Sequence, residues 1–98
     1  MVEIFAIGGY NEVGKNMTAI KVGNEIVILD MGIHLDSYIK YTQDEDIENL
    51  KESDLRKAGA IPDDTQIYDL RSEVIAIIPT HAHLDHVGAI PYCSNKYN

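Results

Sequence analysis

The chain has 98 residues, of which 45% are apolar, and this is enough for one small domain with its own core. Its formal net charge of −8 excludes this segment as the main surface that holds a polyanion, because nucleic acids are bound through basic side chains. No stretch approaches the roughly 18 apolar residues that span a bilayer, and an N-terminus with Glu3 and no basic segment does not resemble a signal peptide.

The first third of the chain predicts three strands. Residues 3–7 are apolar and end at a glycine pair, which is typical of a buried strand. Residues 17–22 predict a second strand, and the short turn at residues 23–24 separates it from a third at residues 25–29, so these two should form an antiparallel hairpin. The third strand is apolar without alternation, which predicts that both of its faces are covered.

The middle of the chain predicts one surface helix over residues 44–58, because its apolar residues recur at helical spacing and its charges favour the helix dipole. Thr42 and Glu45 have the spacing of a capping box at its start. Gly59 is placed to end it. Most of the acidic residues of the chain fall in and around this segment, which favours a solvated helix lying over a sheet.

The last third predicts a turn, a strand and a helix. Residues 61–64 read as a turn, and residues 74–78 form another apolar strand that Pro79 closes. From about His86 the apolar residues predict a helix, in which Pro91 is tolerated only near the first turn. We find no internal repeat, low-complexity tract or linker, so the sequence predicts one structural unit.

Four potential metal ligands fall within residues 81–86, directly after the last predicted strand. His81 and His83 are two apart in an extended segment, so their imidazoles point the same way and can bind one ion. Asp85 and His86 lie where the chain turns, and they can reach a second ion. Imidazole with carboxylate suits zinc best, with manganese or iron as competitors. Two such ions can polarise a phosphate, generate a bridging hydroxide and stabilise the leaving oxygen.

This pattern, H-x-H-x-D-H after an apolar strand, resembles the signature of the metallo-β-lactamase superfamily. Asp30, at the end of its own strand, resembles the aspartate of the first motif of that superfamily. Residues 8–17, with the sequence GGYNEVGKNM, are similar to the N-terminal signature of the β-CASP nucleases of the ribonuclease J group. The stretches at residues 28–33 and 61–64 resemble the archaeal branch of that group.

The resemblance implies a fold of the α/β (α+β) class. We expect the N-terminal half of an αββα sandwich, with a largely antiparallel or mixed sheet and helices on one face. Residues 1–98 would then be an incomplete metallo-β-lactamase domain without the β-CASP domain that clamps RNA. The sheet face that the second half covers should be an apolar patch larger than a lone domain shows.

Carried onto this chain, the resemblance implies that His81 and His83 bind the first metal and that Asp85 and His86 bind the second. Asp85 and His86 are also the expected catalytic residues, and Asp85 would handle the proton of the attacking water. Asp30 would accept a hydrogen bond from a metal-bound histidine and orient its ring. The expected cofactor is Zn²⁺, two ions per complete site, with Mn²⁺ as an alternative. The remaining ligands of the family come later, so this chain alone should bind metal weakly and lack nuclease activity.

The resemblance further implies metal-dependent hydrolysis of RNA, with single-stranded RNA degraded from 5′ to 3′ by a full-length protein that forms a homodimer.

The chain has a single cysteine, Cys93, which cannot make an internal disulfide and favours a reducing, cytoplasmic setting. We expect its thiol to be buried and idle.

Two other classes of function remain open. One is a hydrolase for small substrates on the same scaffold, such as a thioesterase of the glyoxalase II kind or a lactonase. The other is a non-catalytic interaction fragment.

Residues 9–15 match most of a phosphate-binding loop, but Asn16 stands where that motif needs a hydroxyl. A strand follows instead of the helix that the motif requires, so we expect no nucleotide site there. His34 and Asp36 could line the rim of the metal site, and we expect His34 to be solvated.

Overall fold

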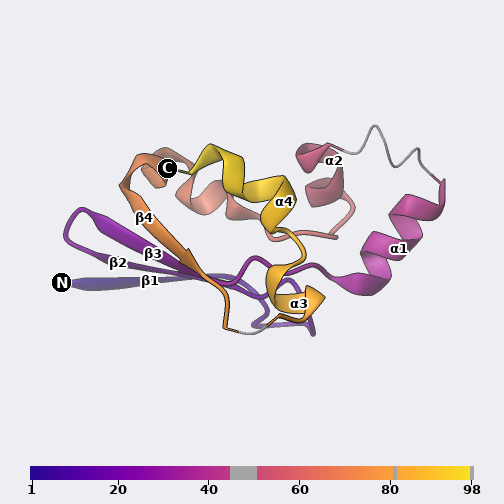
Figure 1. Cartoon of the computed structure of the whole chain (residues 1–98), viewed down its shortest axis with the longest axis horizontal. Helices are drawn as coiled ribbons and strands as arrows, with labels where there is room; N and C mark the ends of the chain where they lie inside the picture. The colour runs from indigo at the N-terminus through magenta and orange to yellow at the C-terminus, as the bar shows by residue number, and fades with distance from the viewer. Residues whose placement is uncertain (45–50, 81, 98) are drawn as a thin grey trace.

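A four-stranded sheet forms the base of the protein. The structure is a computed structural model that describes residues 1–44, 51–80 and 82–97. The strands lie in the spatial order β1-β2-β3-β4 (Figure 1). Their bounds are Val2–Gly8 for β1, Met17–Val22 for β2, Glu25–Leu29 for β3 and Val74–Ile78 for β4. All four predicted strands are confirmed, and the first is longer than expected by one residue at each end.

The sheet is mixed, as expected for the fold class. β1 and β2 are antiparallel, and β2 pairs with β3 in a tight antiparallel hairpin in which Val22 lies opposite Glu25. β4 pairs with β3 in parallel, so Leu29 and Ile78 are neighbours at the carboxyl ends of these two strands. The segments that follow β3 and β4 therefore leave the sheet at the same edge, and both carry residues singled out from the sequence.

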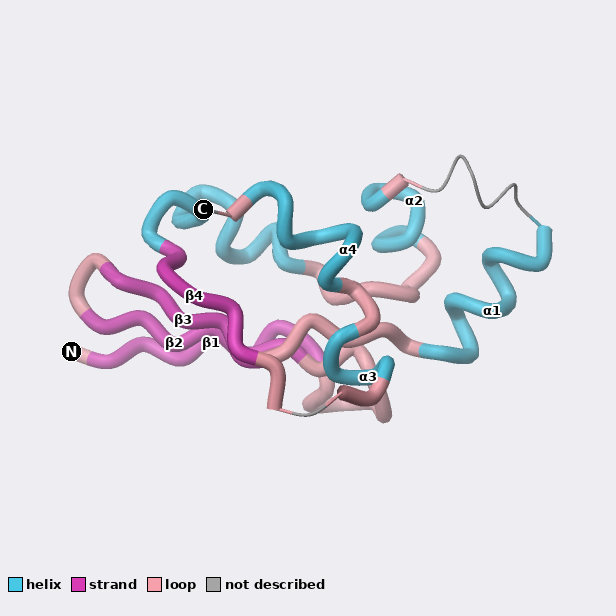
Figure 2. The backbone as a smooth tube through the Cα atoms, in the orientation of Figure 1, coloured by secondary structure: helices cyan, strands magenta, loops and turns pink. Residues whose placement is uncertain are grey.

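Some of the helical segments lie over one side of this sheet, and others lie beyond the ends of the strands (Figure 2). Helix α1 spans Leu35–Asp44 and α2 spans Glu52–Lys57. A 3₁₀ helix, η2, spans Asp64–Glu73 and leads into β4. The last elements are α3 (Leu84–Val87), α4 (Ile90–Cys93) and the short 3₁₀ helix η3 (Ser94–Lys96). The helix predicted from about His86 is present as α3 and α4, and Pro91 lies in the first turn of α4, as that prediction required.

The single helix predicted over residues 44–58 is wrong. Lys51 has an extended backbone and precedes α2, so no helix runs through it, and residues 45–50 lie outside the described part of the chain. Thr42 does not cap a helix start, because it lies inside α1, where its hydroxyl donates a hydrogen bond to the carbonyl of Tyr38 at 2.9 Å. Its predicted partner Glu45 is among the residues not described. Gly59 does end α2, with a positive φ of 77°.

The turn predicted at residues 61–64 is better described as a buried entry into a helix. Ile61 and Asp64 are each 1% exposed. Asp63 precedes η2, and its side chain accepts a hydrogen bond from the Thr65 N–H. Charged and proline-rich segments are normally exposed, so this burial follows from contacts that the local sequence does not contain.

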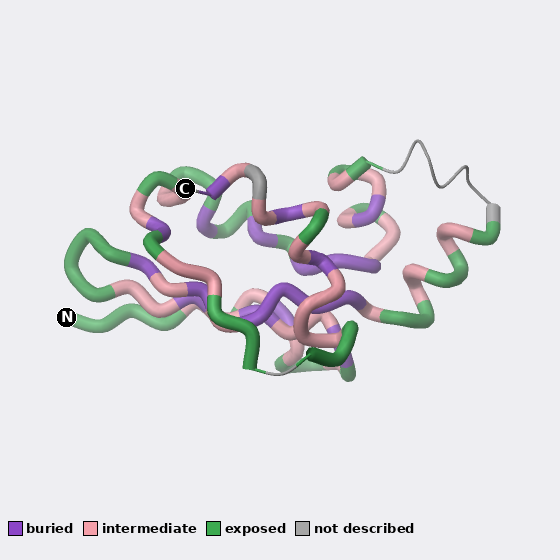
Figure 3. The backbone as a smooth tube through the Cα atoms, viewed as in Figure 1, coloured by how far each residue is buried: buried purple, intermediate pink, exposed green. Residues whose placement is uncertain are grey.

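The core lies between the sheet and the helices. In β3, Ile26 and Ile28 are fully buried, whereas Val27 and Leu29 on the opposite face are only half-buried (Figure 3). The prediction that both faces of β3 are covered is therefore wrong for this chain. Helices cover one face, and the other keeps the apolar character that led to the prediction.

No helix in the described part of the chain is both long enough and apolar enough to cross a bilayer.

Candidate metal centre

The candidate site forms where β3 and β4 end side by side. Asp30 follows β3, and Thr80 follows β4 after a single proline. The Asp30 N–H donates to the carbonyl of Ile78 at 3.0 Å, which extends the parallel pairing by one step. This contact brings the Asp30 carboxylate against the start of the histidine-rich segment.

The Asp30 carboxylate is held by three donors. Its Oδ1 accepts the Thr80 N–H at 2.7 Å, and its Oδ2 lies 2.9 Å from the Thr80 hydroxyl. Its Oδ2 also lies 2.8 Å from Nδ1 of His86. Asp30 is 6% exposed and adopts a left-handed φ of 68°. Aspartate tolerates this conformation better than most residues, so the sequence can turn sharply here and still present a carboxylate inward.

These contacts set the charge of Asp30. Burial by itself raises the pKa of this carboxyl, but the hydrogen bonds from His86 and Thr80 outweigh burial and hold the pKa below its usual range. Asp30 is therefore an anion at neutral pH. An anionic acceptor beside Nδ1 favours the tautomer of His86 that carries its proton on that nitrogen. In this tautomer Nε2 has the lone pair that coordinates a cation.

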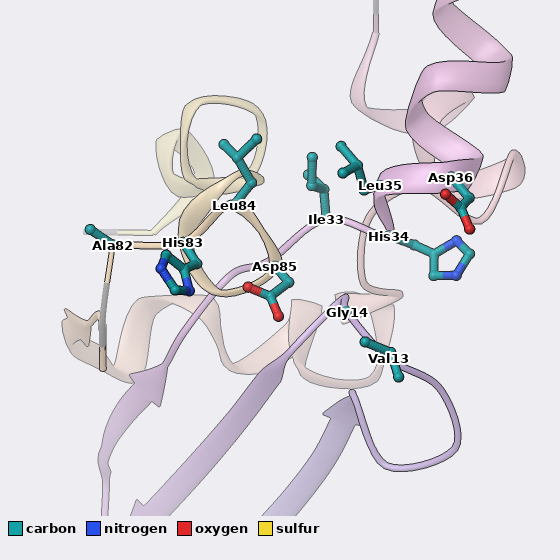
Figure 4. A pocket seen from close by; sticks show the side chains of 10 residues that line it. All are labelled: Val13, Gly14, Ile33, His34, Leu35, Asp36, Ala82, His83, Leu84 and Asp85. Carbon is teal, nitrogen blue, oxygen red and sulfur yellow. The ribbon is translucent and has the colours of Figure 1, made fainter.

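The other predicted ligands lie around helix α3. His83 immediately precedes the helix, and Asp85 and His86 are in it. The Nε2 of His86 lies 3.7 Å from a carboxylate oxygen of Asp85. His83 and Asp85 both line an open cavity of about 620 Å³ and lie close together at one end of it (Figure 4). His81 lies outside the described residues.

The structure thus brings Asp30 to Nδ1 and Asp85 near Nε2 of His86, and it places Asp85 and His83 on one cavity. Two imidazoles and a carboxylate are a donor set that fits a divalent transition metal or zinc. The exposed position of His83 and Asp85 fits ion entry from solvent, and the anionic Asp30 behind His86 fits a metal-ligating histidine. The chemistry of these residues therefore suits the metal implied by the sequence pattern.

His34 and Asp36 line the far end of this cavity (Figure 4). The Nδ1 of His34 lies 2.7 Å from the Ser37 hydroxyl, and the Ser37 N–H also points to this nitrogen at 3.4 Å. The side chain of His34 therefore caps the first turn of α1 by accepting the hydrogen bond of the Ser37 N–H. The sequence placed these residues on the rim of the site, and the structure shows a capping contact for the histidine.

A second group of potential ligands lies away from the histidines. Among the described residues, Glu52, Asp64 and Cys93 have ligand atoms within 4.8 Å of one another. Two side-chain cations already bind here, since Lys96 contacts both carboxylates and Arg56 donates to Asp64 at 3.0 Å. Burial and the nearby carboxylates raise the pKa of the Cys93 thiol to about 12, so this thiol is protonated at neutral pH beside the two side-chain cations. This group is an ion-pair cluster.

Sequence reasoning missed Thr80 as part of the site. Its N–H and hydroxyl both contact Asp30, and its hydroxyl lies 3.3 Å from Nδ1 of His86. The signal was its position, directly before the histidines and after the closing proline of β4. The prediction that Cys93 is buried is confirmed.

The chain resembles known proteins along its whole length. A family model described as the metallo-beta-lactamase superfamily matches residues 10–98. The ribonuclease J of Methanocaldococcus jannaschii is 50% identical over 97 residues, which are 99% of this chain and 21% of that protein. The ribonuclease J of Pyrococcus abyssi is 49% identical over the same shares. That of Mycoplasma genitalium is 38% identical over 92% of this chain and 13% of its own length. The chain spans about a fifth of the length of the two archaeal relatives.

Proposed function

Because this chain belongs to the metallo-β-lactamase superfamily, we propose that it is the N-terminal part of a metal-dependent ribonuclease of the ribonuclease J type. Identities of 50% and 49% to two archaeal proteins of that name support the assignment to this branch. The observation that carries the proposal is the contact between His86 and the anionic Asp30, beside the donors His83 and Asp85.

In the proposed site, His81 and His83 hold one metal ion, and Asp85 and His86 hold a second. Two bound Zn²⁺ ions, or Mn²⁺ ions in their place, would polarise a phosphodiester and lower the pKa of a water molecule beside it. Asp30 keeps the ring of His86 in one orientation. The Asp85 carboxylate, which lines the cavity, would take the proton of the attacking water. Further ligands come from parts of the longer protein.

The proposed substrate is single-stranded RNA, degraded from its 5′ end, and the proposed setting is the cytoplasm. The net charge of −8 on this chain indicates that basic contacts to RNA come from other parts of the full-length protein. We infer that the full-length protein is a homodimer and that residues 1–98 alone, with an incomplete ligand set, bind metal weakly and do not turn over substrate.

The test uses the full-length protein and a single-stranded RNA labelled at either its 5′ or its 3′ end. A 5′-to-3′ exonuclease releases the 5′ label as mononucleotide from the first turnovers. At that stage the 3′ label remains on long RNA, which then shortens step by step. A chelator should abolish this release, and Zn²⁺ or Mn²⁺ should restore it. The His83→Ala and Asp85→Asn variants should lose about 10²–10⁴-fold in kcat. The Asp69→Asn variant, altered on the exposed side of η2 and away from this cavity, should retain activity.

Other outcomes separate the remaining functions. Hydrolysis of thioesters or lactones, with intact RNA, would replace the proposal by a small-substrate hydrolase. A protein that binds no metal and turns over none of these substrates would be a non-catalytic interaction module.

A further inference from the structure

We propose that Asn16 is a positioning residue that fixes the main chain of Asp85 and thereby aims the carboxylate of Asp85 and the ring of His86. Asn16 lies in the loop between β1 and β2, 69 positions before Asp85. Its side-chain Nδ2 donates to the carbonyl oxygen of Asp85 at 2.7 Å. Its main-chain N–H donates to the same oxygen at 3.2 Å. One residue therefore supplies two donors to a single carbonyl of the ligand-bearing segment.

The two neighbouring carbonyls of this segment are also occupied. The Leu84 oxygen accepts the Ile33 N–H at 3.0 Å, and the His86 oxygen accepts the Met31 N–H at 2.8 Å. These two contacts are between main-chain atoms, so a substitution does not remove them directly. The carbonyl between them, that of Asp85, accepts a hydrogen bond from a side chain, the amide of Asn16. A substitution of Asn16 can therefore test whether these hydrogen bonds fix the main chain of residues 84–86.

Close backbone packing leaves this arrangement little freedom. A Cβ placed on Gly32 would lie 1.6 Å from the carbonyl oxygen of Asp85, and one on Gly9 would lie 2.3 Å from Oδ1 of Asn16. The Asn16 carbonyl in turn accepts the Gly32 N–H at 3.0 Å. Asn16 therefore links the β1–β2 loop, the segment after Asp30 and the start of α3, and the backbones at these contacts are too closely packed to shift easily.

The link matters because the Asp85 side chain is itself weakly held. The Asp85 side chain is 38% exposed, and in the described part of the chain its carboxylate approaches Nε2 of His86 only to 3.7 Å. The position from which this carboxylate reaches a metal is consequently set by the main chain of Asp85. Metal ligands must stay within about 0.5 Å of a productive geometry, and loss of an outer contact that orients a ligand typically lowers metal affinity about 10–100-fold. This inference rests on the proposed metal centre and is independent of which substrate that centre hydrolyses.

The experiment compares Asn16→Ala with Asn24→Ala in the full-length protein. Asn24 lies exposed in the β2–β3 turn, so it provides the same substitution at a site without the link. Zn²⁺ dissociation constants are measured by competition with a chromophoric chelator, and amide exchange of the apoprotein is followed by mass spectrometry. We expect Asn16→Ala to weaken Zn²⁺ binding about 10–100-fold and to speed exchange in peptides that cover residues 82–89. Asn24→Ala should match the wild type in both measurements.

A second variant, Asn16→Asp, separates positioning from charge. Aspartate keeps the size of the side chain but has no donor, so it faces the Asp85 carbonyl with an acceptor. Simple charge attraction predicts that a new carboxylate near the cations strengthens metal binding. Loss of the link predicts weaker binding, together with an altered visible spectrum of the Co²⁺-substituted protein, which reports ligand geometry.

A merely structural role for Asn16 would lower the melting temperature of the apoprotein and leave the Zn²⁺ affinity of the folded fraction and the Co²⁺ spectrum unchanged. That result would overturn the inference, as would tighter metal binding by Asn16→Asp. If Asn16→Ala does not fold, the Asn16→Asp measurements decide. A protein that shows the expected metal-binding changes but does not hydrolyse RNA would support this inference and reject the proposed function.

Discussion

Asp30 combines an unfavourable backbone with a full set of side-chain contacts. Its φ of 68° lies in the region that glycine prefers, yet its carboxylate contacts both Thr80 and His86. A strained backbone conformation that is held in place by side-chain hydrogen bonds is typical of a functional site. The strain and the contacts have one explanation, since the reversal of the chain after β3 is what turns this carboxylate toward the histidines.

Replacing Asp30 by asparagine should separate these two features. Asparagine also tolerates a left-handed φ, so the Asp30→Asn variant should fold, but it loses the negative charge against Nδ1 of His86. We expect Zn²⁺ affinity of the full-length protein to fall about 10–100-fold, with a small change in melting temperature. Metal content after dialysis and calorimetric titration would measure this. The Asp36→Asn variant is the matched control, and an unchanged affinity in Asp30→Asn would reject the orienting role.

At the scale of secondary-structure elements, an ion-pair cluster around the buried Asp64 joins the helices. We use this name for the charged and phenolic residues that surround Asp64, namely Glu52, Arg56, Lys96 and Tyr97. Asp64, at the start of η2, is 1% exposed, and its carboxylate lies 2.7 Å from Nζ of Lys96, the last residue of η3. It also accepts the hydroxyl of Tyr97 at 2.6 Å, and burial together with this bond raises the pKa of Tyr97. The cluster therefore ties α2, η2 and η3 to one another.

Removing the charge of Asp64 should destabilise this layer. Breaking a buried ion pair from one side costs about 3–5 kcal/mol, and we expect the lower end for Asp64→Asn, because Arg56 and Lys96 keep some access to water. Amide exchange should accelerate in peptides that cover η2 and η3 before it changes in the sheet. Asp69→Asn, on the exposed side of η2, provides the control. Equal exchange in both variants would show that the cluster does not hold the helices.

At the scale of the whole molecule, one sheet face has no layer over it in the described structure. The strand register places apolar residues of all four strands on this face, where Val2, Ile4, Val22 and Ile78 are 47–68% exposed. On the opposite face, Ile26 and Ile28 are fully buried. A monomeric protein does not normally leave so continuous an apolar surface in water. The patch expected for this fold from the sequence is therefore present.

We predict that residues 1–98 produced alone self-associate through this face. Sedimentation should show species larger than a monomer at micromolar concentration, together with binding of a hydrophobic dye. The double variant Ile4→Thr/Ile78→Thr should shift the chain toward monomer, since both residues lie on the open face. Ile39→Thr changes an isoleucine that is 44% exposed on α1 and should leave association unchanged. Equal association in all three chains would show that another surface is responsible.

The sequence by itself determined the strands and indicated where the proposed metal ligands lie. Apolar runs bounded by glycine and proline identified all four strands because strand signals are local, and the cluster at residues 81–86 identified the metal ligands as a hypothesis without any structure. The helices were less predictable. Charge pattern and apolar spacing favoured one helix over residues 44–58, but Lys51 interrupts it and α1 begins earlier, at Leu35.

The tertiary structure alone decided which distant residues meet. The parallel pairing of β3 with β4 brings Asp30 to Thr80 and His86, 50 and 56 positions later. Together with the antiparallel pairing of β2 with β3, it also brings Asn16 to the carbonyl of Asp85. Such contacts depend on strand order and backbone register, which join segments far apart in the chain and leave no periodic signal in either segment. Local sequence therefore indicated the strands and the candidate donor atoms, and long-range packing decided the geometry in which those atoms can act.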